Sequence, residues 1–327
     1  MRVGFIGLGN IGITLANIIA QNGYEVLGWE YHKDIVDEIN TKHTNSKFLP
    51  EVELDPKLKA TKKVSDVLRY CDIIFNAIHS VNIRSTLEDN RGKVRIGARF
   101  VNLAKGLDEY GITACGILEE LFPENKVIML TGPTIANELA QGNPTMMMMS
   151  GAEKNELMEI ARIIDNDFLR VRFSDDRIGL ELGGILKNIY AIGLGIMEGE
   201  NIKSVNFRAV YLTLALEEMT KFGMAMGAKE ETFLSVAGVG DLLATSISPS
   251  SHNRKMGIML AKGMSIEQIK KSMEVLPEGY NTLKNMLYLS EKLHVTVPLA
   301  QNLWKVIQGK ISGHDFVSLI GKNFLEI

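Results

Sequence analysis

The sequence predicts an α/β protein whose N-terminal part is built on an open parallel sheet and whose C-terminal part is mostly helical. Short apolar runs of strand length recur through the first half, with helix-like stretches between them; this is the pattern of parallel strands joined by crossover helices. From about residue 178 onward strand candidates nearly vanish and long amphipathic stretches replace them. Because 327 residues exceed the size of one ordinary core, we expect two domains, residues 1–180 and 181–327.

The first predicted elements are a strand, a glycine turn, a helix and a second strand, which together form a βαβ unit. Residues 3–6 and 24–29 are the strand candidates, and residues 11–20 repeat apolar side chains at helical spacing until Gly23. We interpret the four methionines 146–149 as flexible filler of a buried strand rather than a ligand site. The further strand candidates are 73–78, 99–103 and 127–131, and the helix candidates are 65–70, 113–121, 180–197, 206–222, 265–273, 281–293 and 299–308.

Composition limits the classes of function. A formal net charge of −3 gives no positive field with which to hold a nucleic acid, although a small anionic ligand is compatible with it. The two cysteines, Cys71 and Cys115, exclude a disulfide framework and fit a reducing compartment. The N-terminus lacks the apolar region of a signal peptide, and no run of about 18 apolar residues predicts a membrane span. We therefore expect a cytoplasmic protein.

A glycine-rich turn follows the first predicted strand and opens the first predicted helix. It reads Gly7-Leu8-Gly9-Asn10-Ile11-Gly12, the G-x-G-x-x-G spacing of Rossmann dinucleotide-binding domains. The first glycine allows the tight turn, the second lets backbone approach a pyrophosphate, and the third lets helix and strand pack closely. The N–H groups at the helix N-terminus then face the phosphates. This motif predicts that Gly7, Gly9, Asn10, Ile11 and Gly12 bind a dinucleotide.

Glu30 ends the second predicted strand, near the offset at which an acidic side chain accepts a hydrogen bond from the ribose 2′-hydroxyl. A 2′-phosphate beside this carboxylate would be repelled, so the sequence favours NAD over NADP. Lys33 lies close by in sequence and could contact a phosphate, which leaves NADP as the alternative.

Lys187 and Asn188 lie within a strongly apolar helix candidate in the second half of the chain. A buried lysine needs a carboxylate or a ligand as partner, and burial lowers its pKa toward a range useful for proton transfer. The alternative is a lysine that extends its ammonium group into solvent. Helical periodicity alone does not decide between the two.

Several separate motifs follow one another along nearly the whole sequence. They are GLGNIGITLA at 7–16, Phe48-Leu49-Pro50, Ala60-Thr61, NLAKGL at 102–107, Gly132-Pro133-Thr134-Ile135-Ala136 with Glu138, ELGGILKNIYAIGLGI at 181–196, NFRA at 206–209 through Glu218-Met219, Thr232-Phe233, AGVGDL at 237–242 and Glu278-Gly279. With these motifs in this order, which is more specific than any one of them, the sequence resembles the NAD(P)-dependent glycerol-3-phosphate dehydrogenases.

The resemblance implies roles for individual residues. Lys187 would be the general acid that protonates the carbonyl oxygen of dihydroxyacetone phosphate, or the base in reverse, and Lys105 would polarise that oxygen and bind substrate. Asp241 would pair with Lys187 or hold a substrate hydroxyl. Two ammonium groups stabilise developing negative charge and lower each other's pKa. The remaining implied substrate contacts are Asn188, Thr245, Ser251, His252, Asn253 and Arg254, and the remaining cofactor contacts are Ser80, Lys105, Ala136, Arg254 and Glu278.

Two positions depart from the family pattern. His252 stands where the family has the first arginine of a serine-arginine-asparagine-arginine stretch, which removes a permanent charge and a bidentate phosphate donor. His79 stands where a proline is usual. His252 is either a tolerated substitution, with Asn253 and Arg254 still binding phosphate, or the sign of a different substrate. Neither histidine has metal-ligand spacing, and we predict no metal site.

Two other functions are consistent with the sequence. A Rossmann domain followed by a helical domain with a catalytic lysine also occurs in ketopantoate reductases and in hydroxyacid dehydrogenases of the 6-phosphogluconate dehydrogenase type, so the substrate could be another phosphorylated or phosphonylated ketone or a ketoacid. A cofactor-binding protein without turnover would have lost the lysine and the aspartate, and both are present here. The resemblance also suggests a homodimer with a small phosphorylated substrate.

Overall fold

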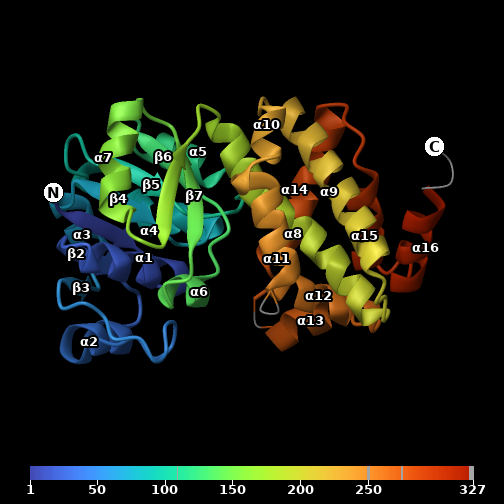
Figure 1. Ribbon diagram of the computed structural model, residues 1–327, viewed down its shortest axis with the longest axis horizontal. Helices are drawn as coiled ribbons and strands as arrows, with labels where there is room; N and C mark the ends of the chain where they lie inside the picture. Colours follow the sequence, from blue (N-terminus) through green and yellow to red (C-terminus); the bar gives the residue numbers. More distant parts are fainter. Residues whose placement is uncertain (109, 249–250, 274, 324–327) are drawn as a thin grey trace. The chain divides into compact units, whose positions relative to one another are not determined.

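The computed structural model describes residues 1–108, 110–248, 251–273 and 275–323, and the chain divides into two compact units. Unit 1 comprises Met1–Asp108 and Ile112–Leu180, and unit 2 comprises Glu109–Gly111 and Glu181–Ile327. Strands β1 to β8 belong to unit 1, whereas helices α9 to α16 belong to unit 2; Figure 1 labels strands β2 to β7 and these helices. The predicted α/β class, with a mostly helical second half, is confirmed.

Unit 1 contains an eight-stranded sheet in the order β3-β2-β1-β4-β5-β6-β7-β8. The first six strands in that order pair in parallel, β7 pairs with β6 antiparallel, and β8 is parallel to β7. The predicted parallel sheet is thus confirmed for six strands, and the last two run the opposite way. The strands are β1 (Val3–Ile6), β2 (Val26–Trp29), β3 (Leu58–Thr61), β4 (Ile73–Asn76), β5 (Arg99–Asn102), β6 (Val127–Thr131), β7 (Thr145–Ser150) and β8 (Leu169–Phe173).

The two strands at the edges of this sheet, β3 and β8, have no long apolar run and were not among the strand candidates. In β3 Lys59 is exposed, and in β8 Arg170 and Arg172 are exposed. Charged side chains on edge strands prevent pairing with other chains. They also interrupt the apolar run from which a strand is predicted in the sequence. Within β7, Met147 and Met149 are buried, in agreement with the prediction of a buried methionine-rich strand.

The helices of unit 1 include three predicted ones, α1, α3 and α5. Thr113 caps α5, because its Oγ1 accepts a hydrogen bond from the Gly116 N–H at 3.2 Å. Glu153 and Glu156 form a capping box that starts α7. The helices are α1 (Asn10–Gln21), α2 (Lys33–Lys42), α3 (Val64–Tyr70), α4 (Ser80–Leu87), α5 (Ala114–Leu121), α6 (Ala136–Ala140) and α7 (Lys154–Ile164), with a 3-10 turn η1 (Glu88–Lys93).

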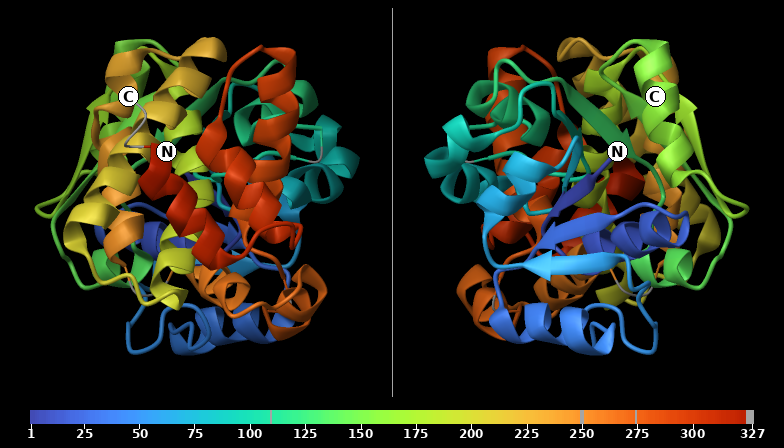
Figure 2. Two further views of the ribbon diagram at one scale, coloured as in Figure 1. Left: turned by 90° about the vertical axis from the view of Figure 1, so that its right-hand side faces the viewer. Right: turned by 90° about the vertical axis from the view of Figure 1, so that its left-hand side faces the viewer.

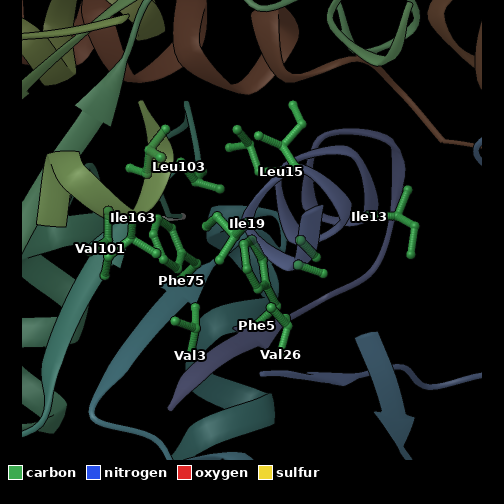
Figure 3. Packing of buried hydrophobic residues seen from close by; sticks show 14 of the residues in the cluster. Val3, Phe5, Ile13, Leu15, Ile19, Val26, Phe75, Val101, Leu103 and Ile163 are labelled. Atoms are coloured by element: carbon green, nitrogen blue, oxygen red, sulfur yellow. The ribbon is translucent and has the colours of Figure 1, made fainter. Parts of the chain in front are cut away.

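The core of unit 1 lies between the central strands and α1. Phe5 of β1 and Phe75 of β4 stack with ring centroids 4.7 Å apart, and Ile19 of α1 packs beside them (Figure 3). All three side chains are fully buried. This apolar contact packs α1 against β1 and β4 and holds the helix in a fixed position on the sheet.

Unit 2 is organised around α8, whose side chains are buried along nearly its whole length. It is the described helix that is long and apolar enough to cross a membrane, and its apolar window is completely buried in the protein. That burial is typical of a core helix. Helices α15 and α16, both red, lie side by side in the left view of Figure 2.

The helices of this unit are α8 (Arg177–Gly199, which starts in the last residues of unit 1), α9 (Val205–Ala225), α10 (Glu230–Phe233), α11 (Asp241–Ile247), α12 (His252–Ala261), α13 (Ile266–Met273), α14 (Glu278–Lys292), α15 (Pro298–Ile307) and α16 (Gly313–Asn323), with a π-helical turn η2 (Val236–Gly240).

Candidate active site

The glycine turn of unit 1 has the geometry that its sequence predicts. Gly7 adopts φ +98°, a conformation that strongly favours glycine. A Cβ atom on Gly12 would collide with the carbonyl oxygen of Gly7, so only glycine lets the first turn of α1 approach β1 this closely. The turn therefore places the N-terminus of α1 at the carboxyl end of the sheet.

Gly9 leaves open space at the start of α1. A Cβ built on it would meet no atom within 4 Å, and Gly9 is the N-cap of the helix, without a side-chain cap. Asn10 and Ile11 follow in the first turn, where no acidic side chain is present. An uncapped N-terminus beside an open glycine suits a pyrophosphate, whose oxygens accept hydrogen bonds from the free N–H groups. The turn therefore fits a bound dinucleotide.

Glu30 directly follows β2, the strand beside β1. Its side chain is buried, and its Oε1 accepts a hydrogen bond from the His32 N–H at 3.0 Å. This bond fixes the carboxylate at the carboxyl edge of the sheet, where the ribose of a dinucleotide bound to the glycine turn is expected. Lys33, the first residue of α2, is exposed.

Lys105 lies shortly after the end of β5, at the same edge of the sheet. Its Nζ donates a hydrogen bond to the Gly132 carbonyl, 2.9 Å away, just after β6. Ser80 is buried at the start of α4 and donates to the Leu107 carbonyl at 3.1 Å. Ala136 is half-buried at the start of α6. The structure therefore brings Lys105 to the carboxyl ends of the strands, and Ser80 contributes a hydrogen bond to the loop after it.

Lys187 of α8 and Asp241 of α11 form a buried ion pair in unit 2. Lys187 is 8% exposed and Asp241 1% exposed, and Nζ of Lys187 donates to Oδ1 of Asp241. The lysine therefore does not extend into solvent. The two charges compensate each other, because either one alone would be strongly unfavourable in this environment. A buried ammonium group held by a carboxylate can donate a proton to a bound substrate oxygen.

Asn188 is oriented by a chain of hydrogen bonds. The Gly279 N–H donates to Oδ1 of Asn253 at 3.0 Å, and because an N–H can only donate, this bond fixes the orientation of the Asn253 amide. Nδ2 of Asn253 then donates to Oδ1 of Asn188 at 3.1 Å. No other hydrogen bond of Asn188 is found in the described part of unit 2, so its Nδ2 hydrogens can donate to a ligand.

The N-terminus of α12 contains three of the predicted phosphate contacts. Oγ of Ser251 caps the helix by accepting from the Arg254 N–H at 3.3 Å, and His252 is exposed at the first helical position. A helix N-terminus favours an anion. Asn253 follows His252 in sequence, yet it is buried and points to Asn188.

Arg254 has a different environment from the one that phosphate binding suggests. Its Nη1 donates to the Ser246 carbonyl at 3.0 Å and to the Ser248 carbonyl, and its Nη2 pairs with Glu198 of α8. These bonds tie α12 to α8 and to the end of α11. Thr245 is half-buried on α11, one turn after Asp241, and Glu278 is half-buried at the start of α14.

Sequence reasoning missed two buried polar groups. Glu218 of α9 accepts hydrogen bonds from the Leu299 N–H (2.8 Å), the Ala300 N–H (2.9 Å) and the Tyr190 hydroxyl (3.0 Å). Burial raises the pKa of this carboxyl to about 7, against the lowering effect of the hydrogen bonds. The other group is an asparagine pair at the ends of β4 and β5. Polar residues that end apolar strands are a signal that could have found this pair.

Other features of the described residues do not add to the site. No group of three histidine, cysteine, aspartate or glutamate side chains among them could hold a metal ion. A cavity of about 640 Å³ in unit 2 is lined by the ends of α12 and α15 and the starts of α13 and α16, and it contains none of the predicted site residues.

A glycine turn that opens a helix at the edge of a parallel sheet, together with a buried lysine–aspartate pair on a helical unit, defines a dinucleotide-dependent dehydrogenase. Residues 2–157 match the model for the N-terminus of NAD-dependent glycerol-3-phosphate dehydrogenases, and residues 176–318 match the model for their C-terminus. The chain belongs to the NAD-dependent glycerol-3-phosphate dehydrogenase family.

Individual relatives agree with this assignment. A glycerol-3-phosphate dehydrogenase [NAD(P)+] of Sphingopyxis alaskensis is 34% identical over 316 residues, covering 96% of this chain and 94% of the relative. A glycerol-3-phosphate dehydrogenase [NAD(P)+] of Staphylococcus aureus is 34% identical over 315 residues, covering 95% of each chain. The chain is therefore an NAD(P)-dependent oxidoreductase of this family.

Solved structures show the same fold. The crystal structure of a glycerol-3-phosphate dehydrogenase from Coxiella burnetii matches with a TM-score of 0.90 and 25% identity, covering 100% of this chain and 99% of that one. A ketopantoate reductase from Ralstonia eutropha matches with a TM-score of 0.62 and 17% identity, covering 99% of each chain. The second likeness concerns the fold alone and carries no information about the substrate.

Proposed function

We propose that this protein interconverts sn-glycerol 3-phosphate and dihydroxyacetone phosphate, with NAD as the preferred dinucleotide. The buried Lys187–Asp241 pair is the observation that carries the proposal. Asp241 holds the Lys187 ammonium group in place, and the lysine lies on a helix that resembles the family's catalytic segment. Family membership and the names of the relatives support the substrate. Unit 1 would bind the dinucleotide, and unit 2 would supply the proton and most substrate contacts.

Lys187 acts as the general acid of ketone reduction. NADH supplies the hydride for the carbonyl carbon. As negative charge develops on the carbonyl oxygen, Nζ of Lys187 donates a proton to it, and the alcohol is formed. Asp241 holds the ammonium group in place and compensates its charge in the buried environment. In the oxidation direction the neutral amine accepts the proton from the substrate hydroxyl.

Three further groups assist this step. The ammonium group of Lys105 binds the substrate oxygen and stabilises charge on it, while the Gly132 carbonyl holds its Nζ. Asn188 donates from Nδ2 to a substrate hydroxyl, with its amide orientation set by Asn253. Thr245, one turn from Asp241, completes the hydrogen-bonding groups of unit 2.

The substrate phosphate binds at the N-terminus of α12. Ser251 and His252 are located there, together with the N–H groups of the first turn. Because the described guanidinium contacts of Arg254 go to Glu198 and to backbone carbonyls, we assign Arg254 a supporting role for this helix. With no arginine at position 252, phosphate binding depends more on the helix N-terminus than in family members that carry one.

The NAD preference depends on Glu30. Its carboxylate is fixed by the His32 N–H and would repel a 2′-phosphate, whereas it can accept a hydrogen bond from a 2′-hydroxyl. The exposed Lys33 would favour a phosphate, so we expect NADPH to bind more weakly rather than not at all.

We further propose that the protein is a homodimer in the cytoplasm. Large apolar side chains of unit 2, among them Val205 and Ile247, each 78% exposed, support an interface between copies. The two buried cysteines, Cys71 and Cys115, fit a reducing compartment. Light scattering coupled to size-exclusion chromatography measures the mass in solution, and a monomer at micromolar concentration would contradict the dimer.

A substrate panel tests the proposed function. NADH oxidation is measured with dihydroxyacetone phosphate, with ketopantoate and with other keto-phosphates, in the wild-type protein and in the His252→Arg variant. We expect dihydroxyacetone phosphate to be the best substrate in both proteins, with a lower KM in the variant because arginine adds a phosphate donor. If only a different ketone drives oxidation in the wild-type protein, the assignment of the substrate is wrong.

Loss of Lys187 separates catalysis from binding. Lys187→Ala should lower kcat by a factor on the order of 10² to 10⁴, the range of general acid catalysis, while NADH affinity stays near that of the wild-type protein. Lys284→Ala, at an exposed position of α14, is the matched control and should retain full activity. Unchanged turnover in Lys187→Ala would refute the lysine scheme and favour a protein that binds the cofactor without this chemistry.

A further inference from the structure

Two buried asparagines lie side by side at the carboxyl ends of strands β4 and β5. Asn76 ends β4 and Asn102 ends β5; the strand register pairs the two residues, and neither side chain is exposed. Nδ2 of Asn76 donates to Oδ1 of Asn102 at 2.8 Å. Buried amides are unfavourable unless their hydrogen bonds are made. The groups to which these amides bond therefore show what the pair holds in place.

Asn102 makes every hydrogen bond that its amide allows. Oδ1 accepts from the Ala104 N–H at 3.2 Å as well as from Asn76, and Nδ2 donates to the Ala104 carbonyl at 3.0 Å and to Sδ of Met129 at 3.3 Å. Because a backbone N–H only donates and a carbonyl only accepts, the two bonds to Ala104 determine which amide atom is oxygen. The Asn102 side chain is thus hydrogen-bonded to both backbone polar groups of Ala104, the N–H and the carbonyl.

Ala104 directly precedes Lys105. The bonds to Ala104 therefore also fix the position of the backbone from which the Lys105 side chain extends. The backbone is also held at Leu103, whose N–H donates to the Asn76 carbonyl at 2.9 Å. Beyond it, Nζ of Lys105 reaches the Gly132 carbonyl at 2.9 Å. The chain leaves β5 here as a loop, and a loop without side-chain anchors would let a long lysine side chain occupy many positions.

We propose that Asn102, held in turn by Asn76, is the positioning residue that fixes Lys105 for substrate binding. The inference rests on the role of Lys105 in the proposed function. The asparagine pair does not touch the substrate and acts only through the backbone before Lys105. Its loss raises KM for the ketone and lowers kcat/KM, and it leaves the glycine turn, which lies in another loop, able to bind NADH.

The first experiment replaces both amides by residues of high strand propensity. Asn76→Val/Asn102→Val removes the hydrogen bonds together, so that neither partner remains buried and unsatisfied. We expect kcat/KM for dihydroxyacetone phosphate to fall about 10- to 100-fold, as for a catalytic group displaced by about 1 Å, with little change in the dissociation constant of NADH. Asn125→Val is the control: its Nδ2 donates to the Ala98 carbonyl at 2.7 Å, at the opposite end of β5. It should keep wild-type kinetics.

A Lys105→Met background shows whether the effect passes through the lysine. If the pair acts by positioning Lys105, adding both valines to Lys105→Met lowers kcat/KM by no more than about twofold, because coupled residues are not additive. A full additional loss in that background would overturn the proposal, and so would wild-type kinetics in the double valine variant. If the wild-type protein does not reduce dihydroxyacetone phosphate at all, the proposed function fails instead, which distinguishes the two failures.

Asn102→Asp provides a test that keeps the shape of the side chain. A carboxylate still accepts from the Ala104 N–H and from Asn76, but its second oxygen repels the Ala104 carbonyl. Protonation turns that oxygen into a donor and restores the bond. The activity of Asn102→Asp relative to wild type should therefore rise as the pH is lowered from about 8 to about 6, since burial raises the pKa of such a carboxyl. A constant ratio over this range would overturn the proposal.

Discussion

Unit 1 and unit 2 offer different kinds of group to charged ligands. Unit 1 offers backbone N–H groups at the start of α1, with Gly7, Gly9 and Gly12 shaping the approach. Unit 2 uses charged side chains that are buried and paired, such as Lys187 with Asp241. Backbone donors carry no net charge that must be compensated, whereas each buried ion needs its counterion. The comparison predicts that unit 2 is the more sensitive to loss of a single charged group.

The two tryptophans of the chain allow each unit to be followed separately. Trp29 ends β2 in unit 1, and Trp304 lies on α15 in unit 2. Trp29→Phe therefore leaves an emission signal from unit 2 only, and Trp304→Phe leaves one from unit 1 only. Unfolding curves in these two backgrounds assign a change in stability to one unit.

The largest effect is expected from Asp241→Ala. It leaves the Lys187 ammonium group buried without its carboxylate, and breaking a buried pair in this way costs about 3 to 5 kcal/mol. Unfolding in urea, followed by Trp304, should show the loss in unit 2. The double variant Lys187→Met/Asp241→Leu removes both charges and should recover most of the stability while remaining inactive. A single variant as stable as wild type would show that the pair is not buried in solution.

A smaller effect is expected in the glycine turn, where two alanine substitutions separate folding from binding. Gly12→Ala sets a Cβ atom against the Gly7 carbonyl and should destabilise unit 1 by about 3 kcal/mol, the upper range for overpacking. Gly9→Ala meets no neighbour and should leave the unfolding curve unchanged, while NADH binds more weakly because the new methyl group enters the space for the pyrophosphate. Titration of NADH by fluorescence measures the second effect. Equal stability of the two variants would contradict the geometry of the turn.

This difference between the units also explains how much could be predicted from the sequence. The glycine turn is local: six adjacent residues define it, and its strand and helix were predicted from apolar spacing alone. The ion pair joins residues 54 positions apart, and the bond between Asn188 and Asn253 spans 65. Periodicity placed Lys187 on a helix but did not determine whether it reached solvent. The family resemblance supplied Asp241 as a candidate partner, and only the structure brought the two together.

The limits of sequence reasoning have physical causes as well. Arg254 follows the phosphate-binding pattern in sequence, and its ligand contacts stay a prediction; its neighbours in space are Glu198 and two carbonyls, which a linear motif does not reveal. Strands β3 and β8 were missed because edge strands carry charged side chains. Asn102 belongs to the NLAKGL segment, but no role was predicted for it, because an asparagine after an apolar run also fits an ordinary turn.

The smallest of these effects concerns Glu218, a buried acid in unit 2 that pairs with a helix N-terminus instead of a cation. Burial raises its folded-state pKa from 4.5 to about 7, so between these pH values the folded protein holds a proton that the unfolded chain has released. The contribution of this bound proton to the free energy of unfolding is fully present below about pH 4.5, and it is lost as the pH rises to about 7. From pH 5 to pH 7 the loss is roughly 2 kcal/mol, at 1.36 kcal/mol per pKa unit.

Glu218→Gln removes this titration, so its unfolding free energy, followed by Trp304 on the helix that Glu218 caps, should fall less between pH 5 and pH 7 than that of the wild-type protein. Glu217→Gln makes the same change at the exposed neighbouring position of α9 and should retain the wild-type pH dependence. If Glu218→Gln and the wild-type protein lose stability in parallel, the carboxyl is already ionised at pH 5. The three hydrogen bonds from Leu299, Ala300 and Tyr190 would then outweigh burial, and the N-terminus of α15 would stabilise its acid as effectively as Lys187 stabilises Asp241.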